Sequence, residues 1–121
     1  MPLRLLVVDD SPVSRVLITE MVRDAGHEVV AEAENLAQTL DAYKTHKPDV
    51  VTLDLSLAQE DGITILKALR QFDGQAKVVV ISGNSQQRVI DIINASGASG
   101  YLTKPVDQDD LLRTLARFTT A

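Results

Sequence analysis

Three short runs of consecutive apolar residues stand out along the chain, and each is bounded by polar residues. Their length and their richness in valine, leucine and isoleucine predict strands that are buried on both faces of a sheet. Two weaker segments, Glu28–Glu32 and Ser99–Leu102, also carry polar residues, which favours strands at the two edges of the sheet. The three apolar runs are Leu5–Val8, Val50–Leu53 and Val78–Ile81.

Helical patterns fill the intervals between these strands. The first helix is predicted to begin with Ser11 as its N-cap and Pro12 in its first position, and to close at Gly26. Its apolar face consists of Val13, Val16, Leu17 and Met21.

The other four helices are predicted to begin at Asn35, at Asp61 or Gly62, at Ser85 and at Asp107. The second must stop before Lys47–Pro48, the third ends near Asp73–Gly74, and the fourth ends at Gly97. Their apolar positions are Leu36, Leu40 and Tyr43; Ile63, Leu66 and Leu69; Val89, Ile90 and Ile93; and Leu111, Leu112 and Leu115.

Five strands that alternate with five helices imply crossover connections and a parallel sheet. We therefore predict an α/β three-layer sandwich. If the two polar strands are the edges, the strand order is 2-1-3-4-5, and strands 1 and 3 are adjacent where the connections diverge. Ligands of such sheets bind at that point, outside the carboxyl ends of the strands.

Composition narrows this picture. A chain of 121 residues is long enough for one domain, which we place at residues 1–121. The formal charge of −5 opposes binding to nucleic acid or anionic lipid. Cysteine is absent, so disulfides and thiolate metal sites are excluded. Since no apolar run reaches the length of a membrane span and no signal peptide begins the chain, we expect a cytoplasmic protein with no membrane partner.

Chemistry-bearing residues follow four of the five predicted strands. Asp9 and Asp10 end the first strand, Asp54 the third and Ser82 the fourth, and Lys104 follows the last. A single pair of carboxylates about 4 Å apart costs roughly 4 kcal/mol at an effective dielectric near 20, which one lysine does not offset for three. Either some of the carboxyl groups are protonated or a divalent cation lies among them, and an all-oxygen ligand set suits Mg²⁺. These are the groups that phosphoryl transfer to an aspartate requires.

The ordered set of motifs resembles the bacterial response-regulator receiver domains of two-component systems, whose fold is flavodoxin-like. The motifs are Val8-Asp9-Asp10-Ser11, Leu53-Asp54, Asp61-Gly62, Val80-Ile81-Ser82-Gly83 and Gly97-Ala98-Ser99-Gly100-Tyr101-Leu102-Thr103-Lys104-Pro105. The resemblance covers essentially the whole chain. It implies that Asp54 takes a phosphoryl group from a sensor histidine kinase or a phosphotransfer protein.

The resemblance also implies a role for each residue near Asp54. Asp10 and Asp54 would bind Mg²⁺ directly, together with the backbone carbonyl of Ser56, and Asp9 would do so directly or through water. Lys104 would pair with a phosphoryl oxygen, and the peptide between Lys104 and Pro105 would be cis.

Phosphorylation in this family acts as a switch. The Ser82 hydroxyl would be drawn towards phosphorylated Asp54, and Tyr101 would fill the space that this movement vacates. The face made by the fourth helix, the last strand and the fifth helix would then bind a downstream target. Ile90 and Tyr101 are our candidates for that contact, although the spacing of Ile90 equally suits a core residue.

Some residues depart from the family pattern, tune its chemistry or stand apart from the site. Ala58 stands where the receiver family usually has proline, and Ser56 and Asn84 stand at positions that in the family tune the dephosphorylation rate. His27 and His46 lie at a turn and at a helix end, so we interpret both as surface or capping residues rather than as phosphate carriers.

Two rival functions remain. An aspartate phosphatase for small molecules needs a second acid two positions after its nucleophile, where this chain has Ser56, and a substrate cap. A binding module is the other rival. Neither a dinucleotide fingerprint nor a P-loop follows the first strand, which disfavours a nucleotide or flavin binder. A pseudo-receiver that is never phosphorylated has the same motifs and stays open.

Overall fold

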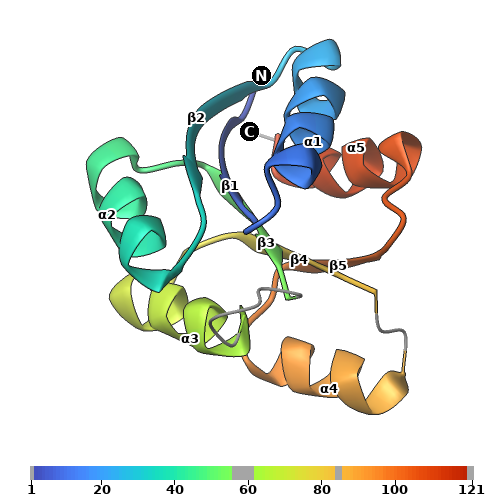
Figure 1. Ribbon diagram of the computed structural model, residues 1–121. Coiled ribbons are helices and arrows are strands. Elements are labelled where there is room, and N and C mark those ends of the chain that lie inside the picture. Colours follow the sequence, from blue (N-terminus) through green and yellow to red (C-terminus); the bar gives the residue numbers. More distant parts are fainter. Residues whose placement is uncertain (1, 56–61, 84–85, 120–121) are drawn as a thin grey trace.

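A computed structural model describes residues 2–55, 62–83 and 86–119. In this part of the chain, five strands alternate with five helices (Figure 1). The sheet is parallel throughout, and its order is β2-β1-β3-β4-β5, as predicted. The elements are β1 (Arg4–Val8), α1 (Pro12–Asp24), β2 (Glu28–Ala33), α2 (Leu36–His46), β3 (Val50–Asp54), α3 (Gly62–Phe72), β4 (Val78–Ser82), α4 (Gln87–Ala95), β5 (Gly100–Thr103) and α5 (Gln108–Ala116).

Helices cover both faces of the sheet, which gives three layers (Figure 1). Successive strand residues point to opposite faces, so alternate residues of β1, β3 and β4 enter two separate cores. Leu6 and Val8 belong to the core under α2, α3 and α4, whereas Leu5 and Val7 belong to the core under α1 and α5. Because both faces are covered, the central strands consist almost entirely of apolar residues.

Local sequence signals fix the helix ends. The Ser11 hydroxyl accepts a hydrogen bond from the Ser14 N–H at 3.3 Å, and the Asn35 side chain accepts one from the Gln38 N–H at 2.9 Å. Each bond satisfies a backbone donor that the helix itself leaves unpaired. Gly26, with φ +89°, follows the end of α1, as expected of a glycine in the left-handed region. The predicted starts at Asp61 and Ser85 lie outside the described residues.

The buried face of α1 differs from the face that the pattern of apolar residues indicated. Val13, Val16 and Leu17 share one side of the helix, but they are 70%, 54% and 52% exposed. The side that packs on the sheet instead carries Ile18, Thr19 and Val22. Apolar residues lie on both sides of this helix, so their spacing alone did not identify the inner side.

The remaining helices pack largely as predicted. Tyr43, Leu66, Leu69, Ile93, Leu111 and Leu115 are buried, whereas Ile63 and Leu112 are half-buried. In α3, Ile65 rather than Ile63 enters the core. Within the described residues, we find no helix that is both long and apolar enough to cross a membrane.

Thr19 provides a test of the α1 packing. Among the buried side-chain polar atoms in the described part of the chain, its hydroxyl is the one that has no hydrogen-bond partner. We expect Thr19→Val to raise the free energy of unfolding by about 1 kcal/mol, because it removes an unpaired polar group at nearly constant volume. Chemical denaturation of both proteins measures this difference.

Thr39→Val is the matched control. The Thr39 side chain is also buried, but its hydroxyl donates a hydrogen bond to the Asn35 carbonyl at 2.7 Å. The same substitution should therefore lower the free energy of unfolding at this position. Destabilisation by Thr19→Val would show that the α1 face packs differently.

Candidate functional site

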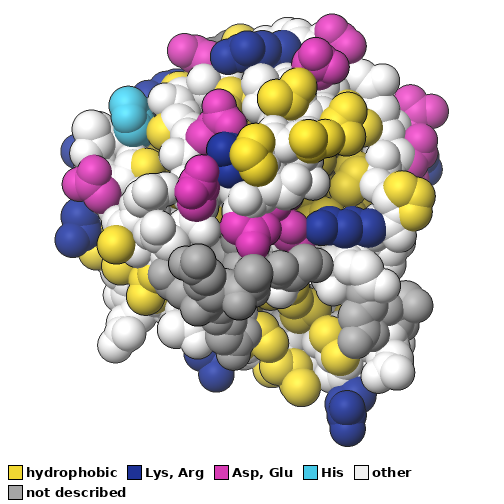
Figure 2. All heavy atoms as spheres, in the orientation of Figure 1, with side chains coloured by type: hydrophobic (Ala, Val, Ile, Leu, Met, Phe, Trp, Pro, Cys, Tyr) yellow, Lys and Arg dark blue, Asp and Glu magenta, His cyan; other side chains and the backbone are white. Residues whose placement is uncertain are grey.

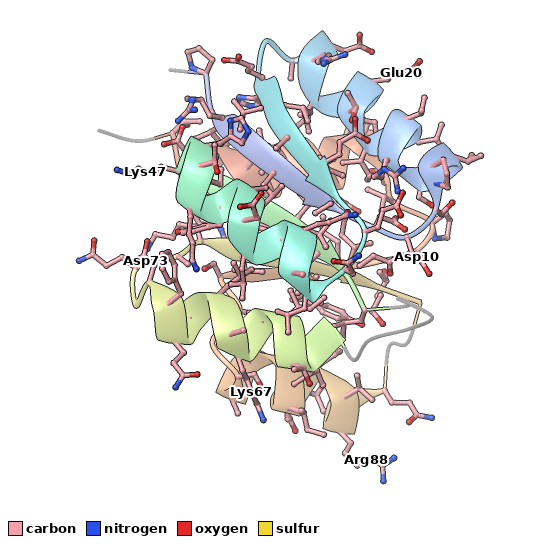
Figure 3. The ribbon with its side chains drawn as sticks, turned by 60° about the vertical axis from the view of Figure 1, so that its left-hand side comes forward. Asp10, Glu20, Lys47, Lys67, Asp73 and Arg88 are labelled. Carbon is pink, nitrogen blue, oxygen red and sulfur yellow. The ribbon has the colours of Figure 1, made fainter. Side chains whose placement is uncertain are left out.

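Three aspartates meet at the carboxyl end of the sheet. Asp9 and Asp10 follow β1, and Asp54 is the last residue of β3. Since β1 and β3 are hydrogen-bonded neighbours with Val8 opposite Leu53, the three side chains leave the sheet at the same level. One carboxylate oxygen from each lies within 4.8 Å of the others. In Figure 2, acidic side chains adjoin a basic one at the centre of this face, and Figure 3 shows Asp10 at this end of the molecule.

Lys104 reaches the same point from the end of β5. Its Nζ lies 2.9 Å from Oδ2 of Asp54, whose side chain is only 4% exposed. The backbone N–H of Lys104 donates to the carbonyl of Ser82 at 2.9 Å, which fixes the start of the loop that carries the lysine. The Lys104–Pro105 peptide is cis, as the sequence resemblance implied. Ser82, the last residue of β4, is buried beside this loop. The structure thus brings together the predicted residues that it describes at this rim.

The charge of this cluster is unbalanced. Burial and, to a lesser extent, the neighbouring Asp54 carboxylate raise the pKa of the Asp9 carboxyl to about 6. A hydrogen bond from the Ser11 N–H and the charge of Lys104 oppose this shift but do not cancel it. The chain therefore holds negative charge here at a cost in free energy.

A small divalent cation fits this donor set. Carboxylate oxygens are the ligands that Mg²⁺ prefers, and its charge would favour the ionised form of Asp9, whose pKa is raised by burial and by the Asp54 carboxylate. Asp9, Asp10 and Asp54 are the described residues that would hold the ion. The proposed fourth ligand, the carbonyl of Ser56, lies outside the described residues, as does Asn84.

The candidate switch and contact residues lie beyond this cluster. Tyr101 is half-buried in β5 and packs against the core under α2, α3 and α4. Ile90 is half-buried in α4, and the more exposed apolar residue of that helix is Ile92, at 45%. The roles of Tyr101 and Ile90 stay predictions.

Two contacts escaped the sequence analysis. Arg15 binds the backbone carbonyl of Asp9, beside the carboxylate cluster. His27 has a structural role, because its Nδ1 accepts a hydrogen bond from the Leu3 N–H at 3.0 Å, and burial lowers the pKa of its imidazole. His46 is the last residue of α2, as expected of a helix-end residue. The contact of Arg15 with the Asp9 carbonyl could not be predicted, because a single basic residue in a helix carries no sequence signal of its partner.

Comparison with known proteins identifies the family. The sequence model of the response regulator receiver domain matches residues 5–116. The chain is 44% identical over 113 residues to the chemotaxis protein CheY of Bacillus subtilis, a match that covers 93% of each. It is also 32% identical to the transcriptional regulatory protein PdtaR of Mycobacterium tuberculosis, over 92% of this chain and 54% of that protein.

Among solved structures, the chain resembles one in the CheX–CheY–BeF3–Mg²⁺ complex of Borrelia burgdorferi with a TM-score of 0.92. That match has 28% sequence identity and covers 100% of this chain and 92% of the other. The chain therefore belongs to the response regulator receiver domains of two-component systems, and it is CheY-like. Such domains are signalling proteins rather than enzymes that act on small molecules, and they bind Mg²⁺ at an acidic pocket.

The raised pKa of Asp9 predicts how cation binding depends on pH. Above about pH 6 the Asp9 carboxyl is ionised and available to a cation, whereas below it a proton competes for the same oxygen. We therefore expect Mg²⁺ affinity, measured by calorimetry, to fall as the pH is lowered through about 6.

Asp9→Asn tests the same shift through stability. A folded-state pKa above the ordinary value of 3.8 means that ionisation of Asp9 lowers the stability of the metal-free protein as the pH rises from about 4 to about 6. The variant lacks this loss and can still accept the Ser11 N–H. At about pH 7.5 it should unfold at a higher temperature than metal-free wild type, by roughly 4 °C per kcal/mol, and the difference should vanish near pH 4. Equal midpoints at the higher pH would contradict this reading.

Proposed function

We propose that residues 1–121 form one phosphorylation-activated receiver domain, in which Asp54 accepts a phosphoryl group from a sensor histidine kinase or a phosphotransfer protein. The observation that carries this proposal is the Asp54 carboxylate, buried at the sheet rim among two further aspartates and paired with Lys104 at 2.9 Å. A buried carboxylate with a cation on one side is a suitable nucleophile for phosphorus.

The transfer of the phosphoryl group to Asp54 is a displacement reaction at phosphorus. An oxygen of Asp54 forms a bond to the phosphorus of a phosphohistidine, the P–N bond breaks, and the leaving imidazole nitrogen keeps the electron pair. Lys104, now beside Asp54, donates a hydrogen bond to a phosphoryl oxygen. Asp9, Asp10, Asp54 and the Ser56 carbonyl would hold Mg²⁺. When bound, this ion offsets the negative charge of the phosphoryl oxygens.

The same site would release the phosphoryl group. Water that attacks phosphorus breaks its bond to Asp54 and regenerates the carboxylate, so the domain supports its own dephosphorylation. Ser56 and Asn84 are the predicted determinants of this rate. The Borrelia burgdorferi complex supports the ligand class, because that CheY-containing structure includes BeF3 and Mg²⁺.

Phosphorylation would alter the face formed by α4, β5 and α5. The new phosphoryl oxygens would attract the Ser82 hydroxyl, and Ser82 lies opposite Thr103 in the pairing of β4 with β5. Movement of Ser82 would therefore reach β5, where Tyr101 is half-buried and able to shift inward. A downstream target that prefers the altered face, through Ile90 and Tyr101, would shift the equilibrium towards it.

The alternative is a pseudo-receiver that binds partners without phosphorylation, and it has the same fold. A cytoplasmic location and the lack of direct nucleic-acid binding also stay predictions. Whether Asp54 becomes phosphorylated distinguishes the receiver from the pseudo-receiver.

The decisive experiment is phosphorylation by a small phosphodonor. Incubation of wild type with acetyl phosphate and Mg²⁺ should add the mass of one phosphoryl group, measured on the intact protein. Asp54→Asn should stay unmodified, because an amide is a poor nucleophile. Asp41→Asn, which changes an exposed carboxylate of α2, should be modified like wild type. If wild type stays unmodified, the pseudo-receiver function is favoured.

Ser82→Ala tests the switch. We expect this variant to be phosphorylated, since Asp54 and Lys104 are unchanged, but to lose the response of α4 and β5. Hydrogen exchange with and without acetyl phosphate measures that response segment by segment. Ser82→Thr keeps the hydroxyl and should retain it. A full response in Ser82→Ala would exclude the serine hydroxyl as the link.

A further inference from the structure

Arg15, in the first turn of α1, is a basic residue whose side chain is only 13% exposed. A guanidinium that loses so much hydration is tolerated where its donors are paired. Nη1 donates to the Asp9 carbonyl at 2.7 Å, and Nε donates to Oε1 of Glu32 at 3.0 Å. Nη2 lies 3.3 Å from Oε1 of Glu34. One planar group thus joins the turn after β1, the end of β2 and the residue that follows β2.

The Asp9 carbonyl belongs to the peptide that joins Asp9 to Asp10. β1 ends at Val8, so beyond it the β3 ladder no longer holds this peptide. The Asp9 N–H donates to the Ala33 carbonyl at 3.0 Å, and the Asp9 carboxylate accepts from the Ser11 N–H at 2.9 Å. Arg15 adds a bond to the carbonyl. The plane of this peptide sets where the Asp10 side chain leaves the backbone.

The contribution of Arg15 is geometric rather than electrostatic. Its charge is already met by two carboxylates, those of Glu32 and Glu34. The cation that lowers the pKa of Asp9 is Lys104, and the net shift is still upward. A guanidinium holds three acceptors in one plane, which the single ammonium of lysine does not reproduce.

We infer that Arg15 is a positioning residue for the cation site: by holding the Asp9–Asp10 peptide between α1 and β2, it directs both carboxylates at the ion. This inference rests on the proposed function, which supplies the ion. It differs from a purely stabilising role, because it predicts a specific loss of Mg²⁺ affinity.

The test begins with Mg²⁺ titration of unphosphorylated protein by calorimetry. Residues that orient metal ligands typically contribute 10-fold to 100-fold in affinity, so Arg15→Ala should weaken binding by about 10-fold or more. Arg15→Lys should restore only part of this loss. Arg113→Ala removes an exposed arginine that pairs with Asp110 alone among the described contacts, and it should bind like wild type.

Thermal unfolding separates positioning from stabilisation. A ligand raises the free energy of unfolding by RT ln(1 + [L]/Kd), so the stabilisation at one fixed Mg²⁺ concentration, obtained from the midpoint shift and the unfolding entropy of each variant, reports affinity. If Arg15 only stabilises the fold, the midpoints with and without Mg²⁺ fall together and the shift persists. A positioning role makes the shift smaller. The double variant Glu32→Gln/Glu34→Gln keeps Arg15 but removes its two anionic partners, and it should give an intermediate shift even if Arg15→Ala fails to fold.

Phosphorylation kinetics give a second readout. The Mg²⁺ concentration for half-maximal phosphorylation by acetyl phosphate should rise in Arg15→Ala, while the rate at saturating Mg²⁺ approaches that of wild type. Wild-type protein that takes up no Mg²⁺ would overturn the proposed function itself. Wild-type binding with unchanged affinity in the folded Arg15 variants would overturn this inference alone.

Discussion

Crowding of carboxylates at the end of two adjacent strands is the constraint from which the function of this domain follows. β1 and β3 are neighbours, so Asp9, Asp10 and Asp54 occupy one small volume. Lys104 brings one positive charge to Asp54 but leaves Asp9 with a raised pKa. A bound cation would offset this repulsion, so part of the free energy that the crowding costs would appear as affinity for the cation.

The sheet provides the stiffness that such crowding demands. The strands that carry the site are buried on both faces, and two separate cores hold them from opposite sides. Carboxylates that repel one another would move apart on a mobile loop. Here Asp54 is itself the last residue of a fully buried strand, so the main chain resists that movement.

Much of this arrangement could be predicted from the sequence because its signals are local. Apolar runs, the caps Ser11 and Asn35, and the rule that parallel strands end at one rim were enough for the strand order and the meeting of the aspartates with Lys104. The inner side of α1 could not be predicted, because apolar residues surround that helix. The Arg15 contact was equally hidden. Its acceptor is a backbone carbonyl, which every residue possesses, and only the folded turn exposes that carbonyl to the guanidinium.

The residues on the outer side of α1 contribute to the surface of this domain but little to the stability of its fold. Val13, Val16 and Leu17 keep more than half of their surface in contact with water, so they contribute little to the core. Leu17 also borders a cavity of about 500 Å³ whose wall includes Asp9, Lys104 and Pro105. Polar substitutions at these outward positions should therefore change the free energy of unfolding little. The surface beside the carboxylate cluster could therefore differ between two receivers that share the same backbone.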